Sequence, residues 1–179
     1  MANFLVGCDV GTSGTKAVVI DEEGSVLGSH YIEYPLITPR PGWAEQNPEW
    51  YWDSVANAIK ASIGQAKIDA KEIRGVSISA LAPACILVDR QSRPLQFAHI
   101  WMDRRATKEC KWLKEKIGDD RVFQLSGNPI DPYYATAKLM WEKNNRADLY
   151  KMAHKLQTAA DYPVLKLPAR PSRTIPTRA

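Results

Sequence analysis

The sequence predicts an α/β domain whose mixed sheet opens with a three-strand antiparallel meander flanked by helices. Apolar, strand-like segments lie close together at 4–10, 16–21 and 26–35. The turns between them are too short for a crossover helix, which favours antiparallel pairing. Strand-like and helix-like patterns then alternate along the chain. With 179 residues, the chain suits one ordinary domain.

The remaining elements follow in order. A Pro-rich loop over 37–48 leads into a helix over about 49–65, with Asn47 as its N-cap and Pro48 in its first position. Further segments are predicted as strands at 73–80 and 84–89 and as helices at 104–116 and 135–146.

Composition excludes several classes of protein. The chain is 45% hydrophobic and 25% charged, as expected for a soluble globular domain, and no apolar run approaches the roughly 20 residues of a membrane helix. The N-terminus lacks the pattern of a signal peptide. The three cysteines, Cys8, Cys85 and Cys110, form no CxxC pair and are expected to be free thiols. We therefore expect a cytoplasmic protein without a membrane partner.

The net charge of +4 is a property of the C-terminal end. Four basic residues lie within 166–179, and without them the 24 basic residues become 20, which balances the 20 acidic ones. Nucleic-acid binding requires a basic face on the folded body, and none is predicted. We therefore expect no nucleic-acid partner; a basic-tailed binder would show steep salt dependence.

A glycine-rich turn, DVGTSGTK at 9–16, lies between the first two predicted strands. Main-chain amides of such a turn can converge on an anion, and glycine permits close approach. Candidate phosphate-binding residues are Gly11, Thr12, Ser13, Gly14, Thr15 and Lys16. Asp9 could hold Mg²⁺ through water.

Two better-known phosphate motifs do not fit this turn. The dinucleotide fingerprint GxGxxG opens a helix, and the P-loop requires GxxxxGK[ST], whereas this turn opens a strand with neither spacing. The turn by itself leaves an ordinary hairpin with hydroxyl residues as an alternative.

Five ordered motifs then resemble the FGGY carbohydrate kinases. They are GCDVGTSGTKAVVID at 7–21, GWAEQNP at 42–48, IWMDRR at 100–105, DPYY with KLMW at 131–141, and ADY with LKL at 160–167. The resemblance implies an actin-like ATPase (ribonuclease-H-like) N-terminal domain, partial, over 1–167. It also implies ATP and Mg²⁺ as cofactors and leaves a homodimer open for the full-length parent.

The resemblance further implies ATP-dependent phosphorylation of a small-molecule sugar or polyol. Trp101, Asp103, Arg104 and Tyr133 would line the substrate cleft, with Asp103 accepting hydrogen bonds from hydroxyl groups. Ala82-Pro83 replaces the Arg-Glu pair of glycerol kinases and the Met-His pair of xylulokinases. A glycerol substrate is therefore disfavoured. The W-x-D form at 101–103 favours a pentulose, a polyol or a related sugar, and the general resemblance is nearest to xylulokinases, although their Met-His pair is missing here as well.

The family's base aspartate lies in a TDYSNAS-like stretch that this sequence lacks, so no catalytic base is assigned. Residues 168–179 read PARPSRTIPTRA, a basic, Pro-rich string expected to be disordered. One codon choice for this string, read one base earlier after an added A, encodes TGEAVTDYSNAS. We therefore expect a frameshift near Leu167 and an inactive chain; a non-catalytic carbohydrate-binding or regulatory half-domain is the alternative.

Overall fold

A four-stranded mixed sheet forms the centre of the computed structural model, which describes residues 3–167. The strand order is β3-β2-β1-β5, with β5 at one edge. Strands β1, β2 and β3 pair antiparallel in sequence, and β5 runs parallel to β1. The predicted meander is confirmed. The bounds are Phe4–Val10 (β1), Gly14–Ile20 (β2), Val26–Glu33 (β3) and Ile73–Ala80 (β5).

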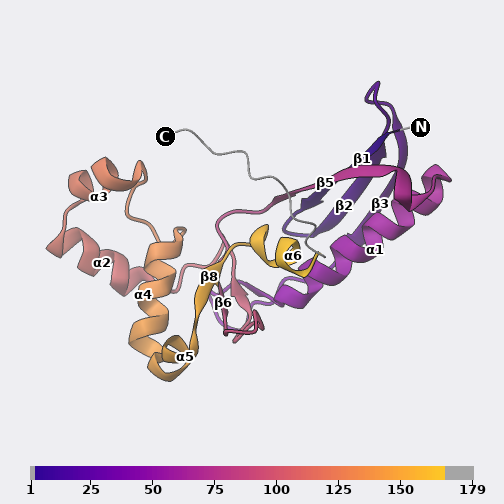
Figure 1. Ribbon diagram of the computed structural model, residues 1–179. Helices are drawn as coiled ribbons and strands as arrows, with labels where there is room; N and C mark the ends of the chain where they lie inside the picture. Colours follow the sequence, from indigo (N-terminus) through magenta and orange to yellow (C-terminus); the bar gives the residue numbers. More distant parts are fainter. Residues whose placement is uncertain (1–2, 168–179) are drawn as a thin grey trace.

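The alternation of side chains along β1 explains where the core lies. Val6, Cys8 and Val10 are buried, whereas Asp9 between them is exposed on the opposite face. Helix α1 (Pro48–Ala66) covers the buried face, as Figure 1 shows. Asn47 caps this helix by accepting a hydrogen bond from the Glu49 amide, as predicted.

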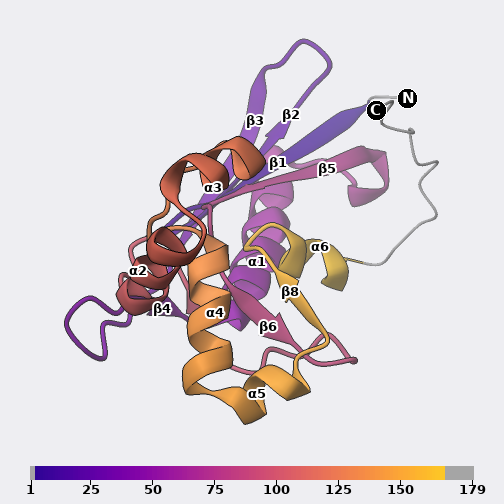
Figure 2. The same ribbon diagram turned by 90° about the vertical axis from the view of Figure 1, so that its left-hand side faces the viewer.

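The second half of the chain builds a helical group beyond the sheet (Figures 1 and 2). Two short ribbons lead into it: β4 (Glu45–Gln46) pairs with β7 (Ala98–His99), and β6 (Ile86–Val88) pairs with β8 (Lys155–Gln157). A 3-10 turn, η1 (Ala70–Glu72), precedes β5. The helices are α2 (Thr107–Lys116), α3 (Asp119–Ser126), α4 (Ala135–Asn145), α5 (Ala147–Met152) and α6 (Asp161–Lys166).

Several predicted bounds require correction. The helix predicted over 104–116 begins at Thr107, because Arg104 and Arg105 turn their side chains into ion pairs before the helix starts. The strand predicted over 84–89 is limited to Ile86–Val88. The short elements β4, β7, β8, α3, α5 and α6 were not predicted.

Other predictions concern the cysteines, the membrane and the tail. All three cysteines are free, as expected, and all three are buried. Among the helices that the structure describes, none combines the length and apolarity needed to cross a membrane. The expected disordered tail, 168–179, lies outside the described residues.

Candidate functional site: a glycine-rich turn beside an aromatic wall

The glycine-rich turn lies where β1 ends and β2 begins. The Gly11 amide donates to the Gly14 carbonyl over 2.8 Å and closes the turn. A Cβ atom at Gly14 would lie 2.4 Å from the Ile32 carbonyl oxygen, so a side chain at this position would force the backbone to move. The parallel strand β5 ends beside the turn, since the Leu81 amide donates to the Val10 carbonyl. Carboxyl ends of parallel strands are common ligand sites in α/β proteins.

Hydrogen bonds from uncharged side chains hold the backbone of the turn in place. The Tyr34 hydroxyl donates to the Gly11 carbonyl over 2.6 Å, and the Gln46 side-chain amide donates to the Thr12 carbonyl over 2.7 Å. Tyr51 in turn donates to Gln46 over 2.9 Å. These bonds occupy main-chain carbonyls, so they hold the shape of the turn without using the amides of Thr12 and Ser13.

The free donors of the turn suit a phosphate group. Among the described residues, the main-chain amides of Thr12 and Ser13 donate to no other group. Ser13 and Lys16 are exposed, and Lys16 adds a positive charge. Because two free amides and the exposed Ser13 lie at the tip, with the Lys16 cation nearby on β2, the turn fits an anion such as the terminal phosphates of ATP.

Thr15 differs from the expectation for this turn. Its side chain is fully buried, and its hydroxyl lies 2.7 Å from the Ser54 hydroxyl of α1. The pair ties the start of β2 to the helix, so the Thr15 side chain supports the turn from inside and is not exposed at its surface.

Asp9 is the residue that the sequence predicts as the Mg²⁺ ligand. It is exposed and lies across from Lys16 in the β1–β2 register and from Ser79 in the β1–β5 register. These residues line a shallow hollow of about 340 Å³ with Ser77. Within residues 3–167 no cluster of three or more His, Cys, Asp or Glu side chains could hold a metal. A lone carboxylate fits Mg²⁺, which keeps several waters and binds phosphate oxygens.

An aromatic wall stands next to the turn. The Trp101 indole N–H donates to the Thr12 hydroxyl over 2.9 Å, which joins the predicted substrate segment directly to the phosphate turn. The Tyr133 hydroxyl donates to the Ala82 carbonyl over 2.7 Å, just after β5. The two rings are 6.4 Å apart, and the Trp101 side chain is 39% exposed. The structure thus brings Thr12, Trp101 and Tyr133 together.

Arg104 forms an ion pair at the protein surface beside the aromatic wall. Its guanidinium group forms a two-pronged ion pair with Asp131, including an Nη2–Oδ2 distance of 2.9 Å. This contact raises the pKa of Arg104 and lowers that of Asp131. Arg104 therefore links the Trp101 segment to the Tyr133 segment at the surface.

Asp103 is placed differently from the expectation. Its side chain is fully buried, and its carboxylate accepts hydrogen bonds from the Ala44 amide (2.8 Å) and from Arg105 (Nη2–Oδ2 2.7 Å). Burial alone would raise the pKa of Asp103, but the bonds from Arg105 and the Ala44 amide outweigh it and lower the pKa. The carboxylate thus points away from the wall and holds the segment that carries Trp101.

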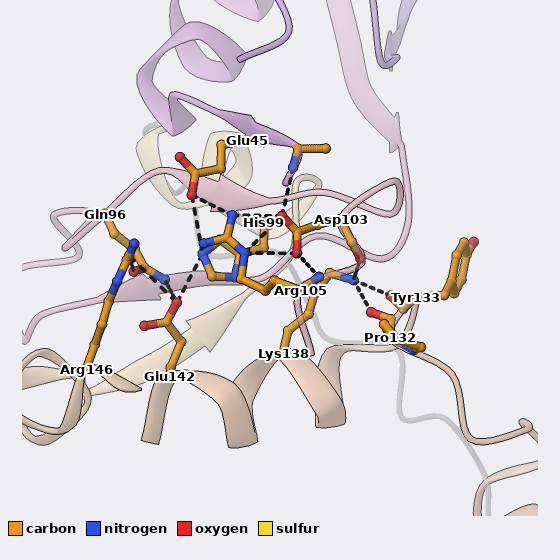
Figure 3. A network of polar contacts seen from close by, with 11 residues as sticks. Glu45, Gln96, His99, Asp103, Arg105, Pro132, Tyr133, Lys138, Glu142 and Arg146 are labelled. Atoms are coloured by element: carbon orange, nitrogen blue, oxygen red, sulfur yellow. Dashed lines mark hydrogen bonds and ion pairs between the residues drawn. The ribbon is translucent and has the colours of Figure 1, made fainter. Parts of the chain in front are cut away.

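A buried network of charges surrounds Asp103 (Figure 3). Arg105 also pairs with Glu45 over 2.6 Å, and its guanidinium carbon lies 3.6 Å from the centre of the Trp43 ring. His99 is fully buried, with Nε2 3.0 Å from Glu142 Oε1 but without hydrogen-bonding alignment. Burial lowers the pKa of His99 to about 3 and raises that of Glu142.

Sequence reasoning missed several members of this network: Arg105, Lys138, His99 and Glu142. Lys138 and Glu142 are four residues apart on a helix, a spacing typical of exposed ion pairs, yet both are fully buried. The available signals were the proximity of Arg105 to the predicted Asp103, which makes a local ion pair possible, and the place of Arg105 and Lys138 within the IWMDRR and KLMW motifs.

The sheet order, with the glycine-rich turn at the carboxyl edge of the sheet, defines an actin-like α/β domain. The chain belongs to the FGGY family of carbohydrate kinases: the family's N-terminal domain matches residues 4–170. The resemblance inferred from the five motifs is thereby confirmed.

Named relatives share this domain. The chain is 32% identical over 164 residues to a xylulose kinase of Klebsiella pneumoniae, covering 92% of this chain and 33% of that protein. It is 31% identical over 155 residues to a glycerol kinase of Thermococcus gammatolerans, covering 87% and 31%. The chain thus spans about a third of the length of these relatives.

Solved structures show the same fold. A "xyloylose kinase" from Brucella ovis superposes with a TM-score of 0.85 at 30% identity, covering 91% of this chain and 34% of that one. A gluconate kinase from Lactobacillus acidophilus gives a TM-score of 0.85 at 28% identity, covering 92% and 33%.

Proposed function

We propose that this domain serves the ATP-dependent phosphorylation of a sugar or polyol, with a xylulose-like pentulose as the leading substrate. The single observation that carries the proposal is the hydrogen bond between Trp101 and Thr12, because it joins the segment proposed to bind substrate to the glycine-rich turn proposed to bind phosphate. Family membership and the xylulose kinase relatives support the substrate class.

Each residue would have a distinct task. The amides of Thr12 and Ser13 and the charge of Lys16 would hold phosphate oxygens, and Asp9 would hold Mg²⁺ through its water shell. When bound, ATP supplies the phosphoryl group. Trp101 would provide an apolar surface for the carbon skeleton of the sugar, and Tyr133 a ring edge with a hydroxyl group.

Substrate preference would depend on the segment after β5. Ala82 and Pro83 bring no charge to the wall, and the Ala82 carbonyl is occupied by the Tyr133 hydroxyl. A glycerol-binding pair of charges is therefore missing, which supports a longer, less charge-dependent substrate. Of the described carboxylates near the turn, Asp9 and Glu33 are exposed and Asp103 is buried. Asp9 is assigned to Mg²⁺, and none of the three is assigned as the catalytic base, which the family carries in a stretch that this sequence lacks. We therefore propose that residues 1–179 bind ligand without transferring phosphate.

Titration calorimetry of the chain with xylulose, gluconate and glycerol tests this proposal. We expect xylulose to bind more tightly than glycerol. Trp101→Ala should weaken xylulose binding about tenfold, since an aromatic contact contributes roughly 0.5–1.5 kcal/mol. Trp112→Ala is the matched control, because Trp112 is 49% exposed on α2 and takes no part in the wall.

Two outcomes would contradict the proposal. Equal loss of binding in both tryptophan variants would place the sugar elsewhere, and the absence of binding to every sugar tested would remove the substrate assignment. A coupled assay with MgATP separates the alternatives. Phosphate transfer by the chain would contradict its proposed inactivity, and sugar binding without it supports a binding domain.

A further inference from the structure

Lys138 is an unusual residue in the described structure. It is the fourth residue of α4, and its side chain is fully buried. Its Nζ donates to the carbonyl oxygens of Pro132 (2.6 Å) and Tyr133 (2.7 Å) and lies 3.4 Å from that of Asp103. An ammonium group has three hydrogens, so these carbonyls match its full donor capacity. Figure 3 shows the side chain reaching from α4 toward both segments.

The three carbonyls belong to the two segments that carry the aromatic wall. Pro132 and Tyr133 belong to the segment before α4, and Asp103 follows Trp101 by two residues. Arg104 and Asp131 join the same two segments at the surface, where the Arg104 side chain is 50% exposed. Lys138 is thus the buried counterpart of an exposed connection.

Burying this ammonium group costs desolvation free energy, which its contacts with the carbonyl oxygens must offset. Within residues 3–167, Lys138 forms no ion pair with a carboxylate, and its position in the first turn of α4 puts a cation at the positive end of the helix dipole. An isolated buried charge is strongly disfavoured, so an apolar residue would fill this space at lower cost. The three carbonyl contacts are what a lysine adds.

We propose that Lys138 is a positioning residue that ties the Tyr133 segment to the Trp101 segment and so sets the spacing of the two rings. The identity of the ligand between those rings rests on the proposed function. The connection between lysine and ring geometry is a property of the free chain, so it can be tested without any ligand.

The protonation state of the Lys138 amine provides a test of the proposed connection between Lys138 and the spacing of the two rings. Burial lowers the pKa of Lys138 to about 8, although Asp103 and Cys85 oppose that shift. Arg104 and Asp131 also face the amine. A neutral amine has two hydrogens for three carbonyls, so deprotonation must release one contact. The contact to Asp103, at 3.4 Å, is the longest of the three and should be released first.

Fluorine NMR of the full chain labelled with 5-fluorotryptophan tests the proposal. Trp101→Phe identifies the Trp101 signal. Between pH 6.5 and 9.5 that signal should shift with a midpoint near pH 8, the value expected for Lys138. Lys138→Met should abolish the transition. Lys143→Met, which removes an exposed lysine from the same helix, should leave it unchanged.

A second measurement keeps the test decisive if Lys138→Met fails to fold. In the unmodified chain, the ¹³Cε signal of Lys138 should titrate with the same midpoint as the Trp101 fluorine signal, while far-UV circular dichroism stays constant. Different midpoints, a Trp101 transition that persists in Lys138→Met, or a simultaneous loss of helix signal would each overturn the proposal. No sugar or nucleotide is present, so failure here is distinct from failure of the proposed substrate.

Discussion

The glycine-rich turn and the aromatic wall touch each other but are held in place by different interactions. Neutral side chains fix the turn: Tyr34 and Gln46 donate to its carbonyls, and Thr15 pairs with Ser54. Buried charges fix the wall, above all Arg105 and Lys138. Hydrogen bonds between uncharged groups do not change with pH near neutrality. A buried group of charges, in contrast, loses stability when any one of its partners is removed or changes its protonation state. We therefore expect mutations and pH to affect the wall first.

The largest loss of folding stability should come from Arg105→Met. This change leaves Asp103 and Glu45 buried without their shared cation, and breaking a buried ion pair costs about 3–5 kcal/mol. Urea unfolding should show a loss of that size or an unfolded chain. Arg93→Met removes a pair whose arginine is 74% exposed and should change stability little. Similar losses in both variants would contradict the contrast between buried and exposed charges.

A smaller loss of folding stability should appear when the pH is lowered. The pKa of His99 is lowered to about 3 by burial, so between pH 6.5 and 3 the unfolded chain binds a proton that the folded chain does not. Stability should therefore fall as the pH falls through this window, by up to about 2 kcal/mol between pH 6.5 and 5. The raised pKa of Glu142 acts in the opposite direction.

His99→Phe tests this assignment by urea unfolding at pH 6.5 and 5. Both ring nitrogens of His99 lack a hydrogen-bond partner, so phenylalanine retains the packing against Trp141 without removing a bond. The variant should lose less stability than the wild type over the same interval. An unchanged loss would assign the acid sensitivity to other groups.

The smallest loss of stability should come from removing both hydroxyls of the neutral Thr15–Ser54 pair together. Thr15→Val together with Ser54→Ala removes both hydroxyls at once and should cost less than about 1 kcal/mol, because no polar atom is left unpaired. Ser54→Ala alone strands the buried Thr15 hydroxyl and should cost about 1–3 kcal/mol. A double-mutant cycle measures the difference, and strictly additive losses would show that the two hydroxyls do not interact.

The same contrast explains what could be predicted from the sequence. The meander, α1 with its cap, and the turn follow from local patterns, because strand alternation and turn residues act over a few positions. The motifs also located Trp101 and Tyr133, which the structure places beside the turn.

Side-chain direction could not be predicted. Thr15 and Asp103 carry the polar groups that a ligand would need, but partners distant in sequence, Ser54 and the Ala44 amide, draw them inward. Lys138 is buried for the same reason, since its acceptors become neighbours only when α4 packs against the two segments. Residue type sets what a group can bind, and only the tertiary fold decides which partner it meets.

Strand β5 has a consequence for handling this protein. It pairs with β1 on one side, and no described strand pairs with its outer edge, where Val76 is 42% exposed. Unpaired edges recruit other strands, so two molecules could join there through their main chains. Stability and binding measurements should therefore be repeated at several protein concentrations, because pairing at this edge would increase with concentration while the properties of the single chain would not change.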